Sequence, residues 1–353
     1  MRVYKPEWPV AFRKVLEMPP KRPIDIQRDA AFTLHIGGDD KSATKEFPST
    51  GDSLYVIKET SVFKIQLADD IDPGRTNPNV PNLSQQVLTA GYENEIVARV
   101  LLTAKYLFDE NNATVEPFVA SLFKNCIALT RQLLELDAMT RELADGILQK
   151  AAAFAVKRAE RNAFSLPSVP DLDTKLHNIL FKADKAKDTI LKICRLQFLP
   201  GASNKSKLAD LEKAVEASLK AEPQLIATWI EITKYFAMIR NMRNACEHPK
   251  ENFQVVLVDF SMQPDGQVNP PLVEIQHPDT SIRTLPVVDL LEFIRNTMLE
   301  HSEIMLTFIR RAVLLMDNPF HEYVVEVPEE ERRHKFARYY RAINVGGTWR
   351  ILG

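Results

Sequence analysis

The residues best suited to chemistry lie in one short segment, Arg240-Asn-Met-Arg-Asn-Ala-Cys-Glu-His-Pro249. A guanidinium such as that of Arg243 offers fork-shaped donors that match a phosphate or a carboxylate. An imidazole such as that of His248 titrates near neutral pH and can move a proton to or from a reacting oxygen. The segment therefore pairs an anion-binding group with an acid–base group.

An amphipathic helix is expected to position this segment. Its apolar residues recur at steps of four and three: Leu225, Trp229, Ile232, Phe236 and Ile239. The next step of four falls on Arg243, whose charge is costly to bury without a partner. We therefore expect Arg243 at an interface, at a cleft or beside an anion. Pro249 disfavours helical geometry at His248, so the helix should end there, where its dipole favours a protonated imidazole.

Arg243, Asn244 and His248 resemble the R-x4-6-H motif of the HEPN superfamily, a group of small α-helical domains. Four residues separate Arg243 from His248, and a polar residue follows the arginine directly, as is common in that family. The setting is also similar, because the motif ends one bundle helix and another long helix follows. The resemblance covers roughly residues 170–316.

The resemblance implies a metal-independent endoribonuclease that acts as a homodimer, with the two motifs meeting across one cleft. In such enzymes the RNA 2′-hydroxyl attacks the neighbouring phosphate and leaves a 2′,3′-cyclic phosphate. Arg243 and His248 would be catalytic, Asn244 would orient a group or a phosphate oxygen, and Glu247 would polarise the imidazole. The implied protein is a toxin or a phage-defence effector, for which RNA is the substrate, a separate antitoxin or regulatory protein is a partner, and no cofactor or metal is needed.

Two other interpretations remain open. The bundle can be a catalytically inactive, HEPN-like module that binds RNA, a nucleotide or a protein, with the β-rich N-terminal region as its recognition surface. It can also be a helical scaffold in which Arg243 and His248 form a helix cap and a structural ion pair with Glu247.

A second match to the same pattern, Arg295-Asn296 followed by His301, shows how easily it arises by chance. His301 falls in an apolar stripe of the last long helix: Ile294, Met298, Met305 and Phe308. We therefore interpret His301 as a core or interface histidine.

The segment Glu331–Arg341 interleaves cations with aromatic residues, as a surface that grips an RNA backbone and stacks bases requires. A solvated amphipathic helix is the alternative explanation. The candidate RNA-binding residues are Arg240, Arg332, Arg333, Lys335, Arg338 and Arg341.

Other candidate sites are weaker. The run His35-Ile-Gly-Gly-Asp-Asp40 mixes a metal-ligand residue with carboxylates, but a solvated turn after a strand explains it as well. The three cysteines, Cys126, Cys194 and Cys246, form no C-x-x-C pair and suggest neither a zinc site nor a disulfide framework. Cys246 has no base at recognisable spacing, which favours packing over a nucleophilic role.

Composition narrows the function classes. Lys and Arg total 45 against 47 Asp and Glu, so a nucleic-acid contact must use a local patch. Glycine-rich phosphate-binding motifs are lacking, which counts against kinases, P-loop NTPases and Rossmann dehydrogenases. No run of about 18 apolar residues occurs and MRVYKPEWPV has no apolar signal segment. We therefore expect a cytoplasmic protein with no membrane partner.

The sequence predicts a mainly α fold with four parts. A β-containing N-terminal region spans residues 1–83, with a strand near 32–36, a pair of strands at 53–58 and 61–67 joined at Glu59-Thr60, and a loop over 69–81. A helical region spans 84–165. Its first helix is capped by Asn82 or Ser84 and runs through Phe108, and a proline-rich loop closes the region. An HEPN-like bundle spans 170–316, with helices near 172–197, 206–220, 223–247 and 287–316 and an inserted hairpin over 253–277. The tail, 317–353, combines a strand, a short basic helix and a hairpin around Gly346-Gly347.

Overall fold

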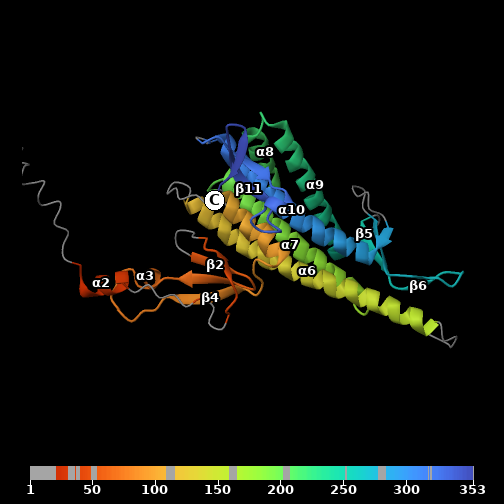
Figure 1. Ribbon diagram of the computed structural model, residues 1–353. Coiled ribbons are helices and arrows are strands. Elements are labelled where there is room, and N and C mark those ends of the chain that lie inside the picture. The colour runs from red at the N-terminus through yellow and green to blue at the C-terminus, as the bar shows by residue number, and fades with distance from the viewer. Residues whose placement is uncertain are drawn as a thin grey trace, which may run out of the picture.

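The computed structural model describes residues 21–30, 36, 40–48, 54–108, 116–158, 165–201, 207–250, 253–276, 284–316, 318 and 320–352 of the chain. Helices account for 56% of the structure and strands for 19%, so the fold is mainly α, as the sequence predicts. Four small sheets surround a group of long helices (Figure 1).

An antiparallel sheet in the order β1-β2-β3-β4 forms the N-terminal region. Its elements are β1 (Thr44–Glu46), β2 (Leu54–Lys58), β3 (Val62–Gln66) and β4 (Leu83–Leu88), with α2 (Pro23–Ala30) and α3 (Ala68–Ile71) beside them. The expected hairpin at Glu59-Thr60 is confirmed, since Val56 pairs with Phe63 and Ile57 with Val62. The strand expected near 32–36 lies outside the described residues, except for Ile36.

The helix expected from Asn82 or Ser84 starts later than the sequence suggests. Residues Leu83–Leu88 pair with β3 as an edge strand, so this part of the prediction is wrong. Asn82 does act as a cap, but its side chain accepts a hydrogen bond from the backbone N of Ala68, at the start of α3, at 2.8 Å. This segment forms a strand because it pairs with β3, and this pairing outweighs its local preference for a helix.

The helix itself begins after Asn94, whose side-chain oxygen accepts from the backbone N of Ile96 at 2.9 Å. It continues through α4 (Glu95–Val97), the π-helical segment η1 (Ala98–Leu102) and α5 (Thr103–Phe108).

The acidic stretch after β3 is more structured than the loop that the sequence predicts. It contains α3, and two arginines hold its carboxylates. Arg28 contacts Asp69 and Asp72 at 3.1 Å each, and Arg75 contacts Asp69 at 2.6 Å. Asp69 and Asp72 therefore have cationic partners, which turn propensities alone do not reveal.

Long helices form the centre of the molecule (Figure 1). They are α6 (Glu116–Arg158), α7 (Leu172–Phe198), α8 (Leu208–Ser218), α9 (Pro223–Glu247) and α10 (Val287–Met316). The four that follow the proline-rich loop match their expected bounds closely, and the loop itself is confirmed at 165–169. α7 packs against both α6 and α9, while α10 packs against α6 and α7.

α9 and α10 run antiparallel. The ring of Trp229 stacks on Phe308 with centroids 5.9 Å apart, whereas Tyr235, further along α9, contacts Phe293, earlier on α10, at 5.8 Å. The C-terminal end of α9 therefore lies at the N-terminal end of α10, close to β5 (Gln254–Val258).

The inserted β structure before α10 is confirmed. β5 pairs with β8 (Leu272–Gln276), which pairs with β9 (Thr284–Pro286), and β6 (Ser261–Met262) pairs with β7 (Val268–Asn269). Gly266, in the turn between β6 and β7, has φ +82°, a conformation that glycine adopts without strain.

The tail forms a three-stranded sheet of β10 (Glu322–Glu326), β11 (Tyr339–Val345) and β12 (Thr348–Ile351). The expected hairpin at Gly346-Gly347 is confirmed, with φ of +60° and +86°. The expected short basic helix is wrong: one 3₁₀ turn, η2 (Glu329–Glu331), precedes an irregular stretch and β11. Tyr340 explains the difference, because it is fully buried and stacks on Tyr106 of α5 with centroids 4.9 Å apart.

One large hydrophobic core joins the helices to one face of the N-terminal sheet and to the tail sheet. The other face of the N-terminal sheet buries a small separate cluster of Val56, Phe63 and Ile65. Within the described part of the chain, no helix combines the length and the apolar character needed to cross a membrane.

Candidate functional site

The predicted catalytic residues Arg243, Asn244 and His248 all lie at the C-terminal end of α9. The helix ends at Glu247, and His248 caps it with φ −135° and ψ 62°, donating its backbone N–H to the carbonyl oxygen of Asn244 at 2.8 Å. The following Pro249 prevents a further turn. The sequence therefore predicted correctly where this helix ends.

Arg243 is half-buried and already has partners within its own helix. Its Nη2 lies 2.7 Å from Oε2 of Glu247, and its Nη1 donates to Oδ1 of Asn244 at 3.0 Å. Its side chain is 26% exposed, and its Nε is buried without a hydrogen-bond partner among the described residues. The guanidinium is therefore held in place, while part of it stays open to solvent.

A histidine of another helix joins this cluster. His177 of α7 places its Nε2 3.5 Å from Oε1 of Glu247, so Glu247 lies between Arg243 and His177. Sequence reasoning missed His177, because it is far from the motif in the chain and only the packing of α7 on α9 brings it near. Among the described residues, the side chain of Glu247 contacts Arg243 and His177 and not His248, so no contact supports the polarising role expected for Glu247.

His248 is exposed at the surface, whereas Cys246 packs inward. Burial raises the pKa of the Cys246 thiol to about 11, with Asp173 and Glu247 adding to the effect. The thiol is therefore protonated at neutral pH, as a packing role requires.

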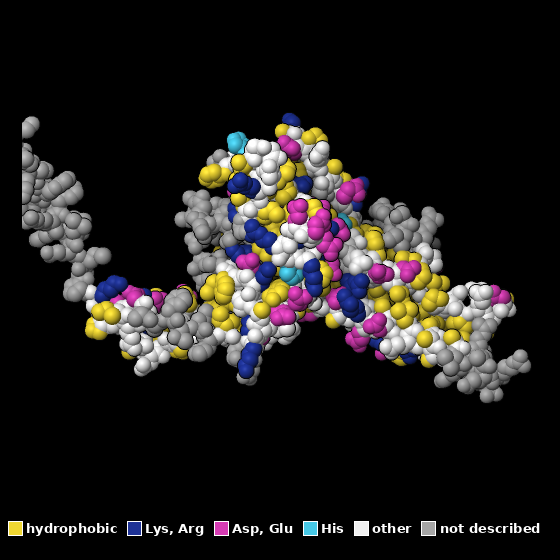
Figure 2. Space-filling view, viewed as in Figure 1, with side chains coloured by type: hydrophobic (Ala, Val, Ile, Leu, Met, Phe, Trp, Pro, Cys, Tyr) yellow, Lys and Arg dark blue, Asp and Glu magenta, His cyan; other side chains and the backbone are white. Residues whose placement is uncertain are grey.

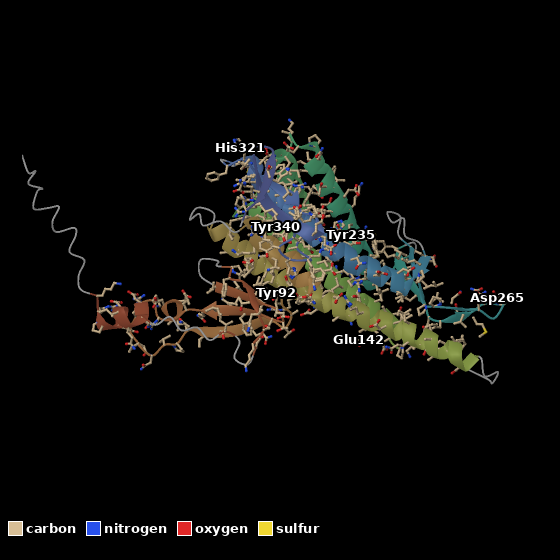
Figure 3. All side chains as sticks on the ribbon, in the orientation of Figure 1. Tyr92, Glu142, Tyr235, Asp265, His321 and Tyr340 are labelled. Atoms are coloured by element: carbon tan, nitrogen blue, oxygen red, sulfur yellow. The ribbon has the colours of Figure 1, made fainter. Side chains whose placement is uncertain are left out.

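The second motif is arranged differently. Arg295 faces α6, with its Nε 3.8 Å from Oδ1 of Asp137. His301 faces α9, where it stacks on Tyr235 with centroids 4.7 Å apart (Tyr235 is labelled in Figure 3) and bonds the carbonyl oxygen of Thr297 through Nδ1 at 2.8 Å. Burial lowers the pKa of His301. The interpretation of His301 as a packed histidine agrees with this geometry.

The basic residues of the tail are largely engaged in contacts that hold the tail in place. Arg338 contacts the fully buried Glu303 of α10 at 2.6 Å, and buried Arg341 lies 3.7 Å from Glu322. Lys335 is exposed and pairs with Glu93 at 2.6 Å.

Two further tail arginines differ in exposure. Arg332 donates to the carbonyl oxygens of Val327 and Lys335, whereas the side chain of Arg333 is exposed. On the face shown in Figure 2, cationic side chains lie among acidic ones.

The tail cations lie away from the α9 motif along α10. Arg338 contacts Glu300 and Glu303, near the middle of that helix. Arg243 and His248 lie near its start, and the helix rises about 24 Å between Val287 and Glu303. Within one chain, the structure therefore brings Arg240, which is exposed on α9, close to the motif, and does not bring the tail residues there.

The weak metal candidate near the N-terminus is only partly described, since His35 lies outside the described residues. The carboxylate of Asp40 accepts hydrogen bonds from the backbone N of Ser42 and the hydroxyl of Ser61, and these bonds lower its pKa. It also lies 3.4 Å from Nζ of Lys58. In the described ranges, no three His, Cys, Asp or Glu side chains are grouped so as to hold a metal ion.

Comparisons with known proteins found no matching family model, no matching curated protein and no matching solved structure.

Proposed function

We propose that this chain is a metal-independent endoribonuclease of the HEPN type, with Arg243 and His248 catalytic and Asn244 supporting them. The observation that carries the proposal is that the last turn of α9 and its cap hold a guanidinium fixed by Glu247, that of Arg243, and an exposed imidazole, that of His248. A phosphate can approach from solvent, because neither group is enclosed by the core.

The proposed reaction starts with attack of the RNA 2′-hydroxyl oxygen on the adjacent phosphorus. The bond from phosphorus to the 5′-oxygen breaks, which leaves a 2′,3′-cyclic phosphate and a free 5′-hydroxyl. Arg243 stabilises the charge that develops on the phosphate oxygens. His248 moves a proton, either from the 2′-hydroxyl or to the departing 5′-oxygen.

A homodimer supplies what one copy lacks. Each chain contributes one imidazole from the motif, that of His248, while the reaction needs both a base and an acid. The neighbouring imidazole of His177 is held by Glu247. Two copies whose α9 ends face each other provide a pair of imidazoles and a pair of guanidiniums around one phosphodiester. We place this enzyme in the cytoplasm, as a toxin or phage-defence effector under the control of a separate protein.

In the free protein, the guanidinium of Arg243 is paired with the carboxylate of Glu247. This carboxylate holds the guanidinium at 2.7 Å, so an RNA phosphate must compete with it for the same donors. Arg240, exposed on the same helix, adds positive charge to the approach. The exposed tail residues Arg333 and Lys335 form a second RNA contact, separate from the reacting phosphate.

The test is cleavage of total RNA by the purified chain in EDTA, with the ends of the products mapped. We expect 2′,3′-cyclic phosphate and 5′-hydroxyl ends, and no cleavage at a site whose 2′-hydroxyl is replaced by hydrogen. Arg243→Ala and His248→Ala should each abolish cleavage. Lys234→Ala is the matched control, because Lys234 is an exposed cation of α9 that pairs with Glu231.

Full activity of the double variant Arg243→Ala/His248→Ala, with the fold intact by circular dichroism, would end the proposal. So would products with 3′-hydroxyl ends, since these require a different bond to break.

A second candidate function is a catalytically inactive module that binds RNA, a nucleotide or a protein. The contacts of Arg243 with Glu247 and Asn244 favour it, because they engage the donors that a phosphate needs. This alternative predicts saturable binding of RNA without turnover, and Arg243→Ala would then weaken binding only.

A further inference from the structure

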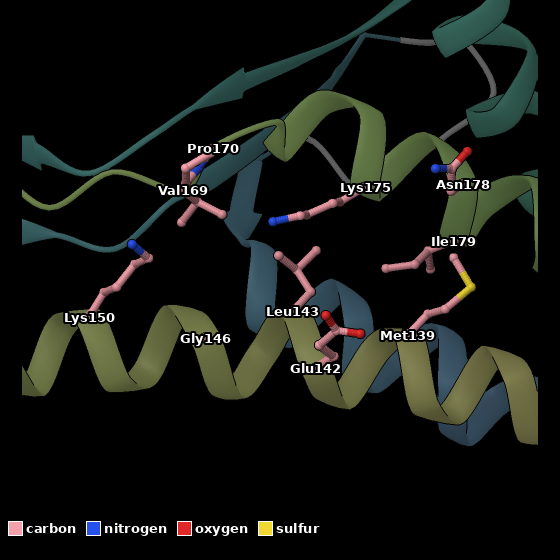
Figure 4. A pocket seen from close by; sticks show the side chains of 10 residues that line it. All are labelled: Met139, Glu142, Leu143, Gly146, Lys150, Val169, Pro170, Lys175, Asn178 and Ile179. Atoms are coloured by element: carbon pink, nitrogen blue, oxygen red, sulfur yellow. The ribbon is translucent and has the colours of Figure 1, made fainter.

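A cavity of about 160 Å³ lies between α6, α7 and the segment Val169–Pro170 (Figure 4). Its lining contains neither Arg243 nor His248. Its apolar end is formed by Met139 and Leu143 of α6 and Ile179 of α7. The polar residues of its lining are two lysines, one glutamate and Asn178.

The two lysines direct their charges to the same place. Lys150 of α6 and Lys175 of α7 extend toward Val169–Pro170 from opposite walls (Figure 4). Neither ammonium group forms a hydrogen bond or ion pair with another described residue, and neither does Glu142. Two lysines minus one glutamate give the lining a net charge of +1. The cavity therefore has unpaired positive charge at one end and an apolar surface at the other.

A larger cavity of about 390 Å³, between α6 and α10, lacks this property. Its arginines are already paired with its carboxylates: Arg99 with Glu95 at 3.1 Å, and Arg141 with Asp137 at 2.9 Å. Arginines and carboxylates that are paired with each other attract a charged ligand weakly. The smaller cavity is therefore the better binding site for an anion.

Gly146 opens the floor of the smaller cavity. It lies in the interior of α6, where glycine is unfavourable for a helix. A Cβ atom built at this position meets no other atom within 4 Å, so no neighbouring segment requires the glycine for close packing. Its effect is to leave space between Leu143 and Lys150.

We propose that this cavity binds a small organic monoanion with a carboxylate head and a short apolar body. The carboxylate lies between Lys150 and Lys175, and the apolar body covers Leu143 and Ile179. The net charge of +1, with Glu142 close by, favours a monoanion over a phosphate dianion. The site does not depend on the proposed ribonuclease activity, because it uses neither Arg243 nor His248.

The test is calorimetric titration of the full chain with hexanoate. For a ligand of this size we expect a Kd on the order of 1 mM. Lys150→Gln and Lys175→Gln should each weaken binding about tenfold, and together they should abolish it. The matched controls are Lys124→Gln and Lys192→Gln, which remove exposed lysines from the same two helices outside the cavity and should leave the affinity unchanged.

A second variant blocks the space and spares the charges. Leucine is a good helix former, so Gly146→Leu should keep α6 intact or raise its melting temperature while hexanoate binding is lost. Hexylamine and inorganic phosphate, tested separately, should each bind at least tenfold more weakly than hexanoate. Unchanged hexanoate affinity in Gly146→Leu or in the double lysine variant would overturn the proposal, as would equal or tighter binding of hexylamine or of phosphate.

Discussion

The chain contains the same arginine–asparagine–histidine pattern twice, and the two copies have different surroundings. Both arginines donate to the adjacent asparagine, Arg243 at 3.0 Å and Arg295 at 3.2 Å, but His248 is exposed and caps α9. Within α10, Arg295 and His301 point to different neighbouring helices, α6 and α9. The spacing is similar, so spacing alone cannot distinguish a candidate site from a packed pair.

Helix geometry explains the difference. In a continuous helix with 3.6 residues per turn, six residues turn the side chain through about 240°, which puts Arg295 and His301 on separate faces. His248 is not bound by this rotation, because Pro249 ends the helix and His248 leaves helical geometry. A proline directly after the histidine is therefore the feature that separates the two motifs.

The largest expected effect is on RNA cleavage. Arg243→Ala should bring cleavage below detection, a loss of at least about 10²–10³-fold, because one group that stabilises the transition state is lost. Arg295→Ala should change it by less than about twofold, since Arg295 lies on the α6 side of α10. The measurement is the initial rate on one defined RNA in EDTA. A comparable loss in both variants would erase the distinction between the motifs.

The second effect is on stability, and here we expect the larger loss in the α10 motif and the smaller loss in the α9 motif. His301→Ala should lower the free energy of unfolding by about 1–3 kcal/mol, because it removes a half-buried ring stacked on Tyr235. His248→Ala should change it by less than about 0.5 kcal/mol, since the side chain is exposed. Urea denaturation of both variants measures the two values. Equal losses would contradict the assignment of His301 to the core.

The third effect is the pH dependence of stability. Burial lowers the pKa of His301, against the smaller opposing effects of the Thr297 carbonyl and Glu300. The unfolded chain then binds the proton more readily, so stability is complete above the ordinary pKa of about 6.5 and declines as the pH falls below it.

His301→Phe keeps an aromatic ring on Tyr235 and removes this titration, so its stability should decline less than that of the wild type below pH 6.5. Burial also lowers the pKa of His334, so the variant should keep part of the slope. Parallel stability curves of variant and wild type would show that His301 does not titrate on unfolding.

The smallest effect concerns the carboxylate that holds Arg243. Glu247→Gln removes the charge that competes with RNA, so RNA affinity should rise by about two- to fivefold. Stability should fall by no more than about 1 kcal/mol, because the pair is partly exposed and close to the surface. Filter binding to an uncleavable 2′-deoxy analogue measures the affinity. Weaker binding would mean that Glu247 is needed to orient the guanidinium.

Most helices could be predicted from local signals. α9 begins at Pro223 and ends before Pro249, and its apolar residues follow the helical period. The sequence therefore predicts both of its ends. Gly346-Gly347 likewise predicts the tail hairpin, because both residues need positive φ. The predictions that were wrong, a helix starting near 84 and a basic helix near 331–341, concern segments whose structure depends on contacts with other parts of the chain. Leu83–Leu88 pairs with β3, and Tyr340 is drawn into the core beside Tyr106.

Part of the candidate site could also be predicted, because Arg243, Asn244 and His248 lie within one turn of the end of a helix. His177 and the cavity at Gly146 could not, since each depends on the packing of α7 against a neighbouring helix. By itself the sequence determined which residues form the long helices and where α9 ends, because periodicity and proline act over a few residues. The tertiary structure decided which charged side chains are paired and which are unpaired. An ion pair depends on the distance between two helices, and the spacing of residues along the chain does not give that distance.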